Sequence, residues 1–293
     1  MASNGHQPDL TGQTMIVTGA NNGIGKITTR ELARMGAHLV MVCRSRERGE
    51  AARQEIIEQS GSDKIDLLIA DLSSQADIRK VAAEINEQYD KIDVLVNNAG
   101  ALFTRRLVSV DGIEMTFALN HLGYFHLTHL LLDKIKASAP ARIVNVSSSA
   151  HIGASMHFDD LEFKRVYRPN AVYGQSKLAN ILFSNELARR LDGTGVTSNA
   201  LHPGFVQTGF GKNNGSLIAG LLGVMQSLFG ISEEEGARTS IYLAASPEVE
   251  GITGHYFDDK QRDVPPTPAG QSVEDAQRLW EISAQMTGIG EAV

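Results

Sequence analysis

Tyr173 and Lys177 lie four residues apart, within a segment of helical character that runs from Ala171 to Leu191. Residues at this spacing share one face of an α-helix, one turn apart. An ammonium group beside a phenol favours the phenolate, and so brings the tyrosine pKa from about 10 toward the range of a general acid or base. The same spacing also fits a half-buried tyrosine and a solvated lysine, so the pair alone leaves both interpretations open.

A glycine-rich stretch from Thr18 to Gly25 follows the apolar run Met15–Val17 and opens a second helical segment. Glycine allows a tight turn and a close approach of the backbone to a ligand. The unpaired N–H groups and the positive dipole end of the new helix favour an anion such as a phosphate. The spacing Gly19-x-x-x-Gly23-x-Gly25 departs from the common Gly-x-Gly-x-x-Gly dinucleotide pattern, and a glycine-rich turn alone is often only a turn.

Strands and helices are predicted in alternation along the chain. Apolar runs typical of strands cover 15–17, 38–42, 65–69, 92–96, 142–146, 196–201 and 252–257. Segments with apolar residues at helical spacing cover 24–35, 47–59, 76–89, 112–137, 171–191 and 232–245. Near-continuous apolar strands alternating with helices predict a parallel sheet covered on both faces. Ligands bind at the carboxyl ends of such strands. The segments expected there are the glycine turn, Asp71, Asn97–Gly100, Ser147–Ser149 and His202–Gly204.

The remaining segments suggest a division of the chain. We expect an extension over 1–12, a catalytic domain over 13–258 and a peripheral C-terminal extension over 259–293 with a short helix at 276–286. The stretch 147–170 is too long for a mere connection, and we interpret it as an active-site loop. The stretch 204–230 is a candidate substrate lid, although its apolar part, 217–229, is equally compatible with a core or interface helix.

Composition and charge narrow the function classes. With 293 residues, 42% of them hydrophobic and 21% charged, the chain has a globular composition and can bury one sizeable core. A net charge of −7 argues against a nucleic-acid partner. The single cysteine, Cys43, permits no internal disulfide and fits a reducing compartment. No secretory signal or membrane-length apolar run is visible, so we expect a cytoplasmic location.

Three histidines on the segment 112–137, namely His121, His126 and His129, invite a metal hypothesis. Their spacing forms no convergent ligand set, and the His-Glu-x-x-His pattern is absent. We therefore expect packed or solvated histidines and no metal. His151 and His202 fall in loops near the predicted site, where either could touch a substrate.

Taken together, the motifs resemble the short-chain dehydrogenase/reductase family. The matching residues follow the family's order between residues 13 and 258: Thr18-Gly19-x-x-x-Gly23-Ile24-Gly25, Asn97-Asn98-Ala99-Gly100, Asn120, Ser148, Tyr173-x-x-x-Lys177 and Pro203-Gly204. Within the family, Val42–Arg44, Asn120–Thr128, Arg142–Ser148 and Ser176–Phe183 look most like the retinol dehydrogenase branch, which protochlorophyllide reductases also resemble. The resemblance implies a single Rossmann-type, doubly wound parallel sheet of about seven strands.

Four catalytic residues are implied by this resemblance. Tyr173 would exchange a proton with the substrate oxygen, and Ser148 would hydrogen-bond that oxygen. Lys177 would hold the nicotinamide ribose and favour the phenolate, and Asn120 would position Lys177 through a water relay. Ser148 is chosen over Ser147 and Ser149 as the second serine after Ile-Val-Asn-Val. Hydride transfer belongs to the cofactor.

The end of the second strand indicates which cofactor is bound. An acidic residue there accepts hydrogen bonds from the adenosine ribose of NAD(H), whereas this sequence has Cys43 and Arg44. A guanidinium can pair with a ribose 2′-phosphate, so NADP(H) is preferred over NAD(H), unless Arg44 is only a surface arginine. By resemblance, Asp71 would cap the adenine and Asn98 would line the adenosine ribose. The expected cofactor-binding residues are Gly19, Asn21, Asn22, Gly23, Ile24, Gly25, Arg44, Asp71, Leu72, Asn98, Ala99, Gly100, Tyr173, Lys177, Pro203, Gly204, Val206 and Thr208.

Three functions stay open. The favoured one is NADP(H)-dependent interconversion of an alcohol and a carbonyl, with a lipophilic, retinoid- or steroid-like substrate implied by the resemblance. Reduction of a ring double bond is a second possibility, disfavoured because the one cysteine lies at the cofactor end. The third is a binding protein that senses NADP(H) without turnover, for which the full set of Asn120, Ser148, Tyr173 and Lys177 is not needed. A homodimer or homotetramer through the helices 112–137 and 171–191 is expected by analogy.

Overall fold

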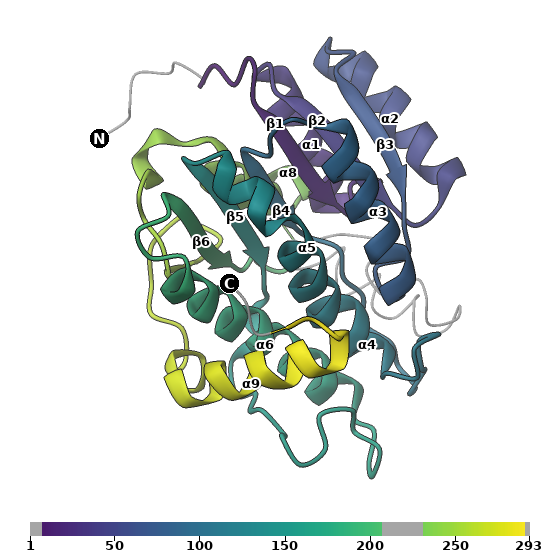
Figure 1. Cartoon of the computed structure of the whole chain (residues 1–293), viewed down its shortest axis with the longest axis vertical. Coiled ribbons are helices and arrows are strands. Elements are labelled where there is room, and N and C mark those ends of the chain that lie inside the picture. The colour runs from purple at the N-terminus through teal and green to yellow at the C-terminus, as the bar shows by residue number, and fades with distance from the viewer. Residues whose placement is uncertain (1–7, 207–230, 291–293) are drawn as a thin grey trace.

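In the computed structural model, which describes residues 8–206 and 231–290, one parallel sheet lies between two layers of helices (Figure 1). Its strand order is β3-β2-β1-β4-β5-β6-β7. The strands are β1 (Thr14–Thr18), β2 (His38–Cys43), β3 (Ile65–Ile69), β4 (Val94–Asn97), β5 (Ala141–Val146), β6 (Val196–Leu201) and β7 (Tyr256–Phe257). The predicted Rossmann-type sheet, doubly wound about β1 and β4, is therefore confirmed.

Helices alternate with the strands, as the sequence predicts. They are α1 (Gly23–Arg34), α2 (Arg46–Ser60), α3 (Gln75–Gln88), α4 (Met115–Phe117), α5 (Gly123–Ala137), α6 (Pro169–Arg190), α8 (Glu233–Ala245) and α9 (Val273–Thr287). Short turns of other helix types are η1 (Ala118–Leu122), η2 (Ser149–His151), η4 (Pro247–Val249) and η5 (Pro268–Gln271). A capping box starts α8, with Ser232 and Glu235 each accepting from the other's backbone N–H.

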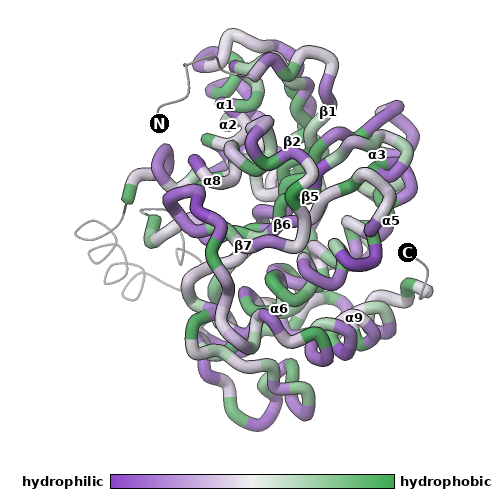
Figure 2. Tube along the Cα trace, turned by 90° about the vertical axis from the view of Figure 1, so that its left-hand side faces the viewer, coloured by the Kyte–Doolittle hydropathy of each residue, from purple (hydrophilic) through white to green (hydrophobic). Residues whose placement is uncertain are grey.

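Two large apolar cores form, one on each face of the sheet, because successive strand residues point to opposite faces. Met15 and Val17 of β1 pack beneath α1, α2 and α8, whereas Ile16 packs beneath α3, α5 and α6. Figure 2 shows the hydrophobic strands between these two helical layers. Burial on both faces explains why the strands are almost continuously apolar.

The long helix predicted over 112–137 is interrupted. A turn with Gly112 at φ 81° precedes Glu114, whose carboxylate accepts the N–H groups of Thr116 and Phe117 and starts α4. A π-helical turn, η1, then joins α4 to α5. The last strand is also shorter than the predicted 252–257, since only Tyr256 and Phe257 pair with β6. In both places the predicted helix or strand is longer than the regular element in the structure.

The C-terminal segment is not peripheral, contrary to the sequence prediction. Helix α9 lies alongside α6 (Figure 1, yellow), and Trp280 is only 3% exposed. The indole ring lies 5.1 Å from Phe125 and 5.9 Å from Phe183, measured between ring centres. The apolar face of α9 therefore completes the core over α5 and α6.

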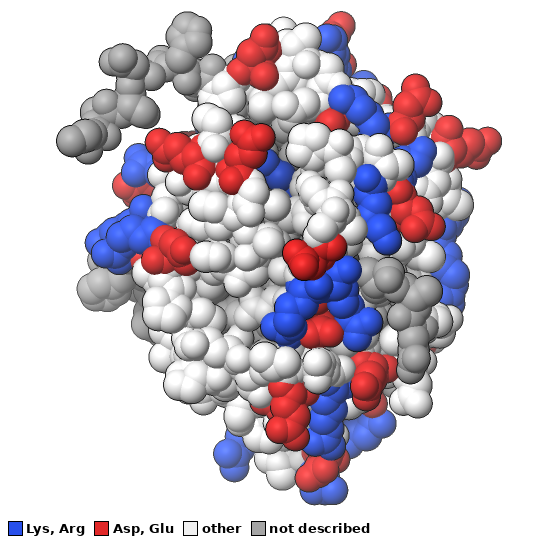
Figure 3. Space-filling model, turned by 60° about the vertical axis from the view of Figure 1, so that its left-hand side comes forward, with Lys and Arg blue, Asp and Glu red and all other residues white. Residues whose placement is uncertain are grey.

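Two predictions concern membranes and a lid. None of the described helices is long and apolar enough to cross a bilayer. The candidate lid over 204–230 falls, from residue 207 onward, outside the described residues. On the face in Figure 3, acidic and basic side chains are interspersed, without a continuous basic surface.

We expect Trp280→Ala to lower the free energy of unfolding by about 3–5 kcal/mol, because it opens a cavity between α9, α5 and α6. Chemical denaturation measures this change. Val273→Ala, at a position 47% exposed on the same helix, should stay within about 0.5 kcal/mol. Equal, small effects of the two substitutions would show that α9 is not part of the core.

Candidate active site

A cavity of about 940 Å³ opens at the carboxyl ends of the central strands. Every cofactor-binding residue expected from the sequence lines it, apart from Thr208, which lies outside the described residues. Ser148 also lines the cavity, whereas Asn120 does not. The residues that the sequence singled out thus gather at one edge of the sheet, from the turn after β1 to the turn after β6.

The glycine turn leaves the start of α1 open toward this cavity. Asn22 precedes α1 but makes no side-chain hydrogen bond to it, and the first turn of α1 holds no acidic residue. By contrast, Ser45 and Ser74 cap α2 and α3. The first-turn N–H groups of α1 are therefore available for an anion.

Thr18 joins the glycine turn to the segment after β4. Its hydroxyl accepts the N–H groups of Asn98 and Ala99 at 2.9 and 3.0 Å and donates to the Val96 carbonyl at 3.3 Å. The Asn98 amide donates in return to the Thr18 carbonyl at 2.8 Å. A Cβ on Gly25 would lie 2.5 Å from that amide nitrogen, so glycine is required there by close packing.

Helix α6 and the end of β5 bring the expected catalytic side chains together. The Ser148 side chain lies against Tyr173 and lowers the pKa of its phenol. The Lys177 ammonium nitrogen donates to the Val146 carbonyl at 3.0 Å and lies 5.8 Å from the centre of the Tyr173 ring. Among the three candidate serines, Ser147 is buried and donates to the Lys177 carbonyl at 2.7 Å, and Ser149 is exposed. Ser148 is thus the serine placed against Tyr173.

Asn120 lies in the π-helical turn, behind the cavity wall. Its side chain accepts the Ala101 N–H at 2.8 Å and donates to the Ala101 carbonyl and the Ser176 hydroxyl, both at 3.0 Å. A Cβ on Gly100 would be 3.3 Å from the Asn120 oxygen and 3.4 Å from the Lys177 nitrogen. Asn120 therefore anchors the segment at 101 next to Lys177, and its expected water relay stays a prediction.

Burial controls the pKa values of Tyr173 and Lys177. It raises the pKa of Tyr173 to about 12, an effect opposed by the hydrogen bond from Ser148. Burial also lowers the pKa of Lys177 to about 7. The sequence predicted a tyrosine pKa lowered by Lys177, and the direction in the structure is the opposite. Tyr173 therefore keeps its proton at neutral pH.

Two arginines line the cavity beyond the end of β2. Arg44 was expected there, but Arg48, one turn into α2, was not identified from the sequence. Neither guanidinium pairs with a carboxylate of the described residues. Arg44 precedes the N-cap Ser45 of α2, so helical spacing does not connect the two arginines and gave no signal for Arg48.

Apolar side chains were also missed as cavity residues. Leu102 and Phe103 line it after β4, and Phe205, which is 49% exposed, lines it after β6. Cys43 is buried, and burial raises its thiol pKa to about 12. The cavity thus joins a polar end at the glycine turn to apolar side chains, without a reactive thiol among the described residues.

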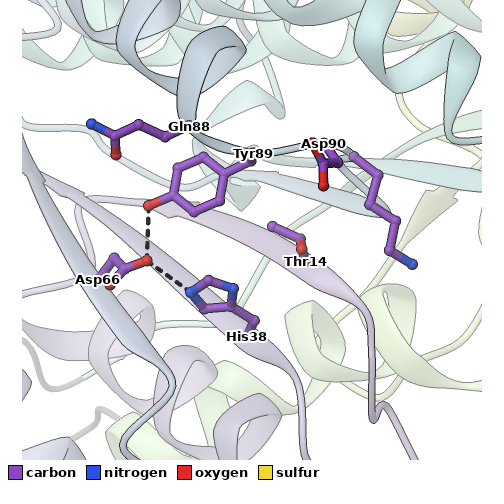
Figure 4. A pocket seen from close by; sticks show the side chains of 7 residues that line it. Thr14, His38, Asp66, Gln88, Tyr89 and Asp90 are labelled. Carbon is purple, nitrogen blue, oxygen red and sulfur yellow. Dashed lines mark hydrogen bonds and ion pairs between the residues drawn. The ribbon is translucent and has the colours of Figure 1, made fainter.

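A second depression and His121 lie away from this cavity. A hollow of about 490 Å³ at the amino ends of the strands contains Asp66, which accepts from the Tyr89 hydroxyl at 2.9 Å and lies 2.7 Å from the His38 ring nitrogen (Figure 4). His121 is buried between helices, 2.8 Å from the Ser283 hydroxyl. The described residues contain no cluster of side chains able to hold a metal ion.

Residues 13–217 match the family model described as short chain dehydrogenase. The chain is a short-chain dehydrogenase. It is 45% identical to retinol dehydrogenase 13 from Homo sapiens over 285 residues, which cover 96% of this chain and 86% of that relative. The predicted resemblance to the retinol dehydrogenase branch is thereby confirmed, and the chain is an oxidoreductase by family.

Solved structures agree with this short-chain dehydrogenase fold. An uncharacterized protein from Mycobacterium paratuberculosis superposes with a TM-score of 0.79 at 30% identity, covering 98% of this chain and 97% of the other. A complex of RhlG from Pseudomonas aeruginosa with NADP gives a TM-score of 0.69 at 28% identity, covering 86% and 97% of the two chains.

The buried Lys177 should make stability depend on pH. Because its pKa is about 7 in the folded protein and about 10.4 in an unfolded chain, the unfolded state binds one more proton between these values. The free energy of unfolding should therefore rise with pH in this window, by up to about 1.4 kcal/mol per pH unit. Urea unfolding of the cofactor-free protein at pH 7.5 and 9.5 measures this rise.

Lys177→Met should abolish this part of the pH dependence, whereas Lys80→Met, at an exposed position, should retain it. An identical pH dependence in the wild type and the Lys177→Met variant would contradict burial as the dominant influence on Lys177.

Proposed function

We propose that this short-chain dehydrogenase interconverts a carbonyl and an alcohol with NADP(H), and that Tyr173 is its general acid and base. The observation that carries the proposal is that the Tyr173 side chain lies against Ser148, which lowers the tyrosine pKa, beside Lys177 in a cavity that also contains the glycine turn. Two hydroxyls at one point can together bind a single oxygen atom of a substrate.

The cavity residues fit NADP(H), which supplies or accepts the hydride when bound. The uncapped N-terminus of α1 suits the pyrophosphate. Arg44 and Arg48, without a carboxylate partner among the described residues, suit a 2′-phosphate. Lys177 would hold the nicotinamide ribose, and the NADP complex of the Pseudomonas aeruginosa relative favours the same choice.

For carbonyl reduction, Ser148 and Tyr173 orient the substrate oxygen and Tyr173 releases its proton to that oxygen as the carbon is reduced. The raised pKa of Tyr173 keeps this proton in place at neutral pH. In the reverse reaction the tyrosine phenolate takes the proton of the alcohol. Protonated Lys177, which is about half of the population at pH 7 when its pKa is about 7, stabilises that phenolate. The two directions therefore draw on different protonation states of the same pair.

A lipophilic substrate fits the apolar side of the cavity. Leu102, Phe103 and Phe205 provide surfaces that small polar carbonyls do not need. The name of the relative retinol dehydrogenase 13 also favours a lipophilic substrate.

Tyr173→Phe should lower kcat for carbonyl reduction by roughly 10²- to 10⁴-fold, because the proton donor is lost. NADPH affinity, followed by quenching of protein fluorescence, should change little. Tyr242→Phe, whose hydroxyl contacts Glu248 at the surface, is the matched control and should keep wild-type activity. Full activity in Tyr173→Phe would contradict Tyr173 as the general acid and base.

Arg44→Glu should lower the ratio of kcat/KM with NADPH to that with NADH by roughly 10- to 150-fold, since a charge-assisted hydrogen bond contributes about 1.5–3 kcal/mol. Arg46→Glu is the control, because Arg46 is exposed and does not line the cavity. An unchanged ratio in Arg44→Glu would argue that this arginine does not select the cofactor.

A further inference from the structure

Three side chains behind Ser148 form a hydrogen-bonded series that the proposed reaction does not use. They are His151 of η2, Tyr256 of β7 and His202 at the end of β6, and none of them lines the cavity. The His151 ring nitrogen Nδ1 lies 2.7 Å from the Ser148 carbonyl and 3.4 Å from the Tyr256 hydroxyl. The same hydroxyl lies 2.9 Å from Nδ1 of His202.

Donor and acceptor roles follow from the partners. A carbonyl oxygen only accepts, so Nδ1 of His151 carries the hydrogen and donates it to Ser148. His202 presents Nε2 to the Asp259 carboxylate at 3.9 Å, which favours the hydrogen on Nε2 and leaves Nδ1 to accept from Tyr256. Burial lowers the pKa of both histidines, which favours the neutral form of each ring.

The His151 ring is fixed from both sides. Only 2% of the residue is exposed, and its ring packs edge-on against Tyr256 with centres 5.1 Å apart. Tyr256 in turn stacks on His202, at an interplanar angle of 16°. The donor that faces Ser148 is therefore preorganised by β6 and β7, two strands that contribute neither Ser148 nor Tyr173.

Ser148 needs such support because it lies just beyond the regular part of β5. Its carbonyl accepts two hydrogens from one residue, the His151 backbone N–H at 3.1 Å and the ring Nδ1–H at 2.7 Å. Its hydroxyl accepts the Ala150 N–H at 3.2 Å while contacting Tyr173. Orientation of the Ser148 peptide thus sets where its hydroxyl lies.

We infer that His151 is a positioning residue for Ser148, held in place by Tyr256 and His202. It acts on the carbonyl of Ser148 and through it on the hydroxyl that faces the substrate oxygen. This inference rests on the proposed role of Ser148. Neither histidine is assigned a contact with the substrate, because both lie outside the cavity lining.

The test compares His151→Phe with His151→Asn in NADPH-dependent carbonyl reduction. Phenylalanine keeps a ring against Tyr256 but removes the donor, whereas the asparagine amide can place a donor near the position of Nδ1. We expect His151→Phe to lower kcat by roughly ten- to a hundredfold, with NADPH affinity within about twofold of wild type. His151→Asn should recover most of that loss.

A second arm introduces His151→Phe into Ser148→Ala. If His151 acts through Ser148, the double variant should be no slower than Ser148→Ala alone. Thermal unfolding monitors whether each variant is folded. If His151→Phe does not fold, His151→Gln replaces it, since the glutamine amide extends beyond the position of Nδ1.

Three results would each overturn the inference. They are a wild-type kcat in His151→Phe, a loss of kcat in His151→Asn as large as that in His151→Phe, and a double variant slower than Ser148→Ala by the full effect of His151→Phe. Failure of the proposed function has a different signature. If Ser148→Ala itself retained full activity, the role of Ser148 in the reaction would be contradicted. Loss of activity in Ser148→Ala without loss in His151→Phe would contradict the positioning role alone.

Discussion

The Thr18 hydroxyl holds together the two turns on which the cavity is built. It binds the backbone after β4 to the end of β1, and Asn98 closes the same contact from the other side. This contact brings Gly25 so close to Asn98 that no side chain fits between them. This contact fixes the positions of the start of α1 and of the segment Asn97–Gly100. Through Asn120 and Gly100 it also fixes what lies beside the ammonium end of Lys177.

Helix α6 carries a buried lysine whose electrostatic cost the rest of the fold must offset. Lys177 is 3% exposed, and its ammonium nitrogen has a backbone carbonyl rather than a carboxylate as its hydrogen-bond partner among the described residues. Behind it, buried Asn97 and Asn145 share a hydrogen bond between β4 and β5 that satisfies part of a polar layer. Helix α9 covers the outer side of α6 with Trp280. The site therefore contains a buried ammonium group without a carboxylate partner among the described residues. The helix that carries it is well packed over the rest of its surface.

Local patterns in the sequence were sufficient to predict the alternation of strands and helices along the chain, because near-continuous apolar runs and glycine turns are encoded within a few residues. The π-helical turn at Asn120 was not predictable in this way, since its side chain bonds to Ala101 and Ser176 from distant segments. Likewise, the burial of Trp280 depends on Phe125 and Phe183, which no local pattern connects to it. The direction of the Tyr173 pKa was wrong because spacing reveals a neighbouring charge but not the degree of burial.

The central claim is that the cavity binds NADP(H) and reduces or forms a carbonyl on a lipophilic molecule. Its most direct test is the steady-state kcat/KM of the wild-type protein for retinal, a steroid ketone and a small polar aldehyde, each with NADPH and with NADH. The account predicts the highest value for a lipophilic carbonyl with NADPH. Turnover confined to small polar carbonyls, or higher efficiency with NADH, would contradict it.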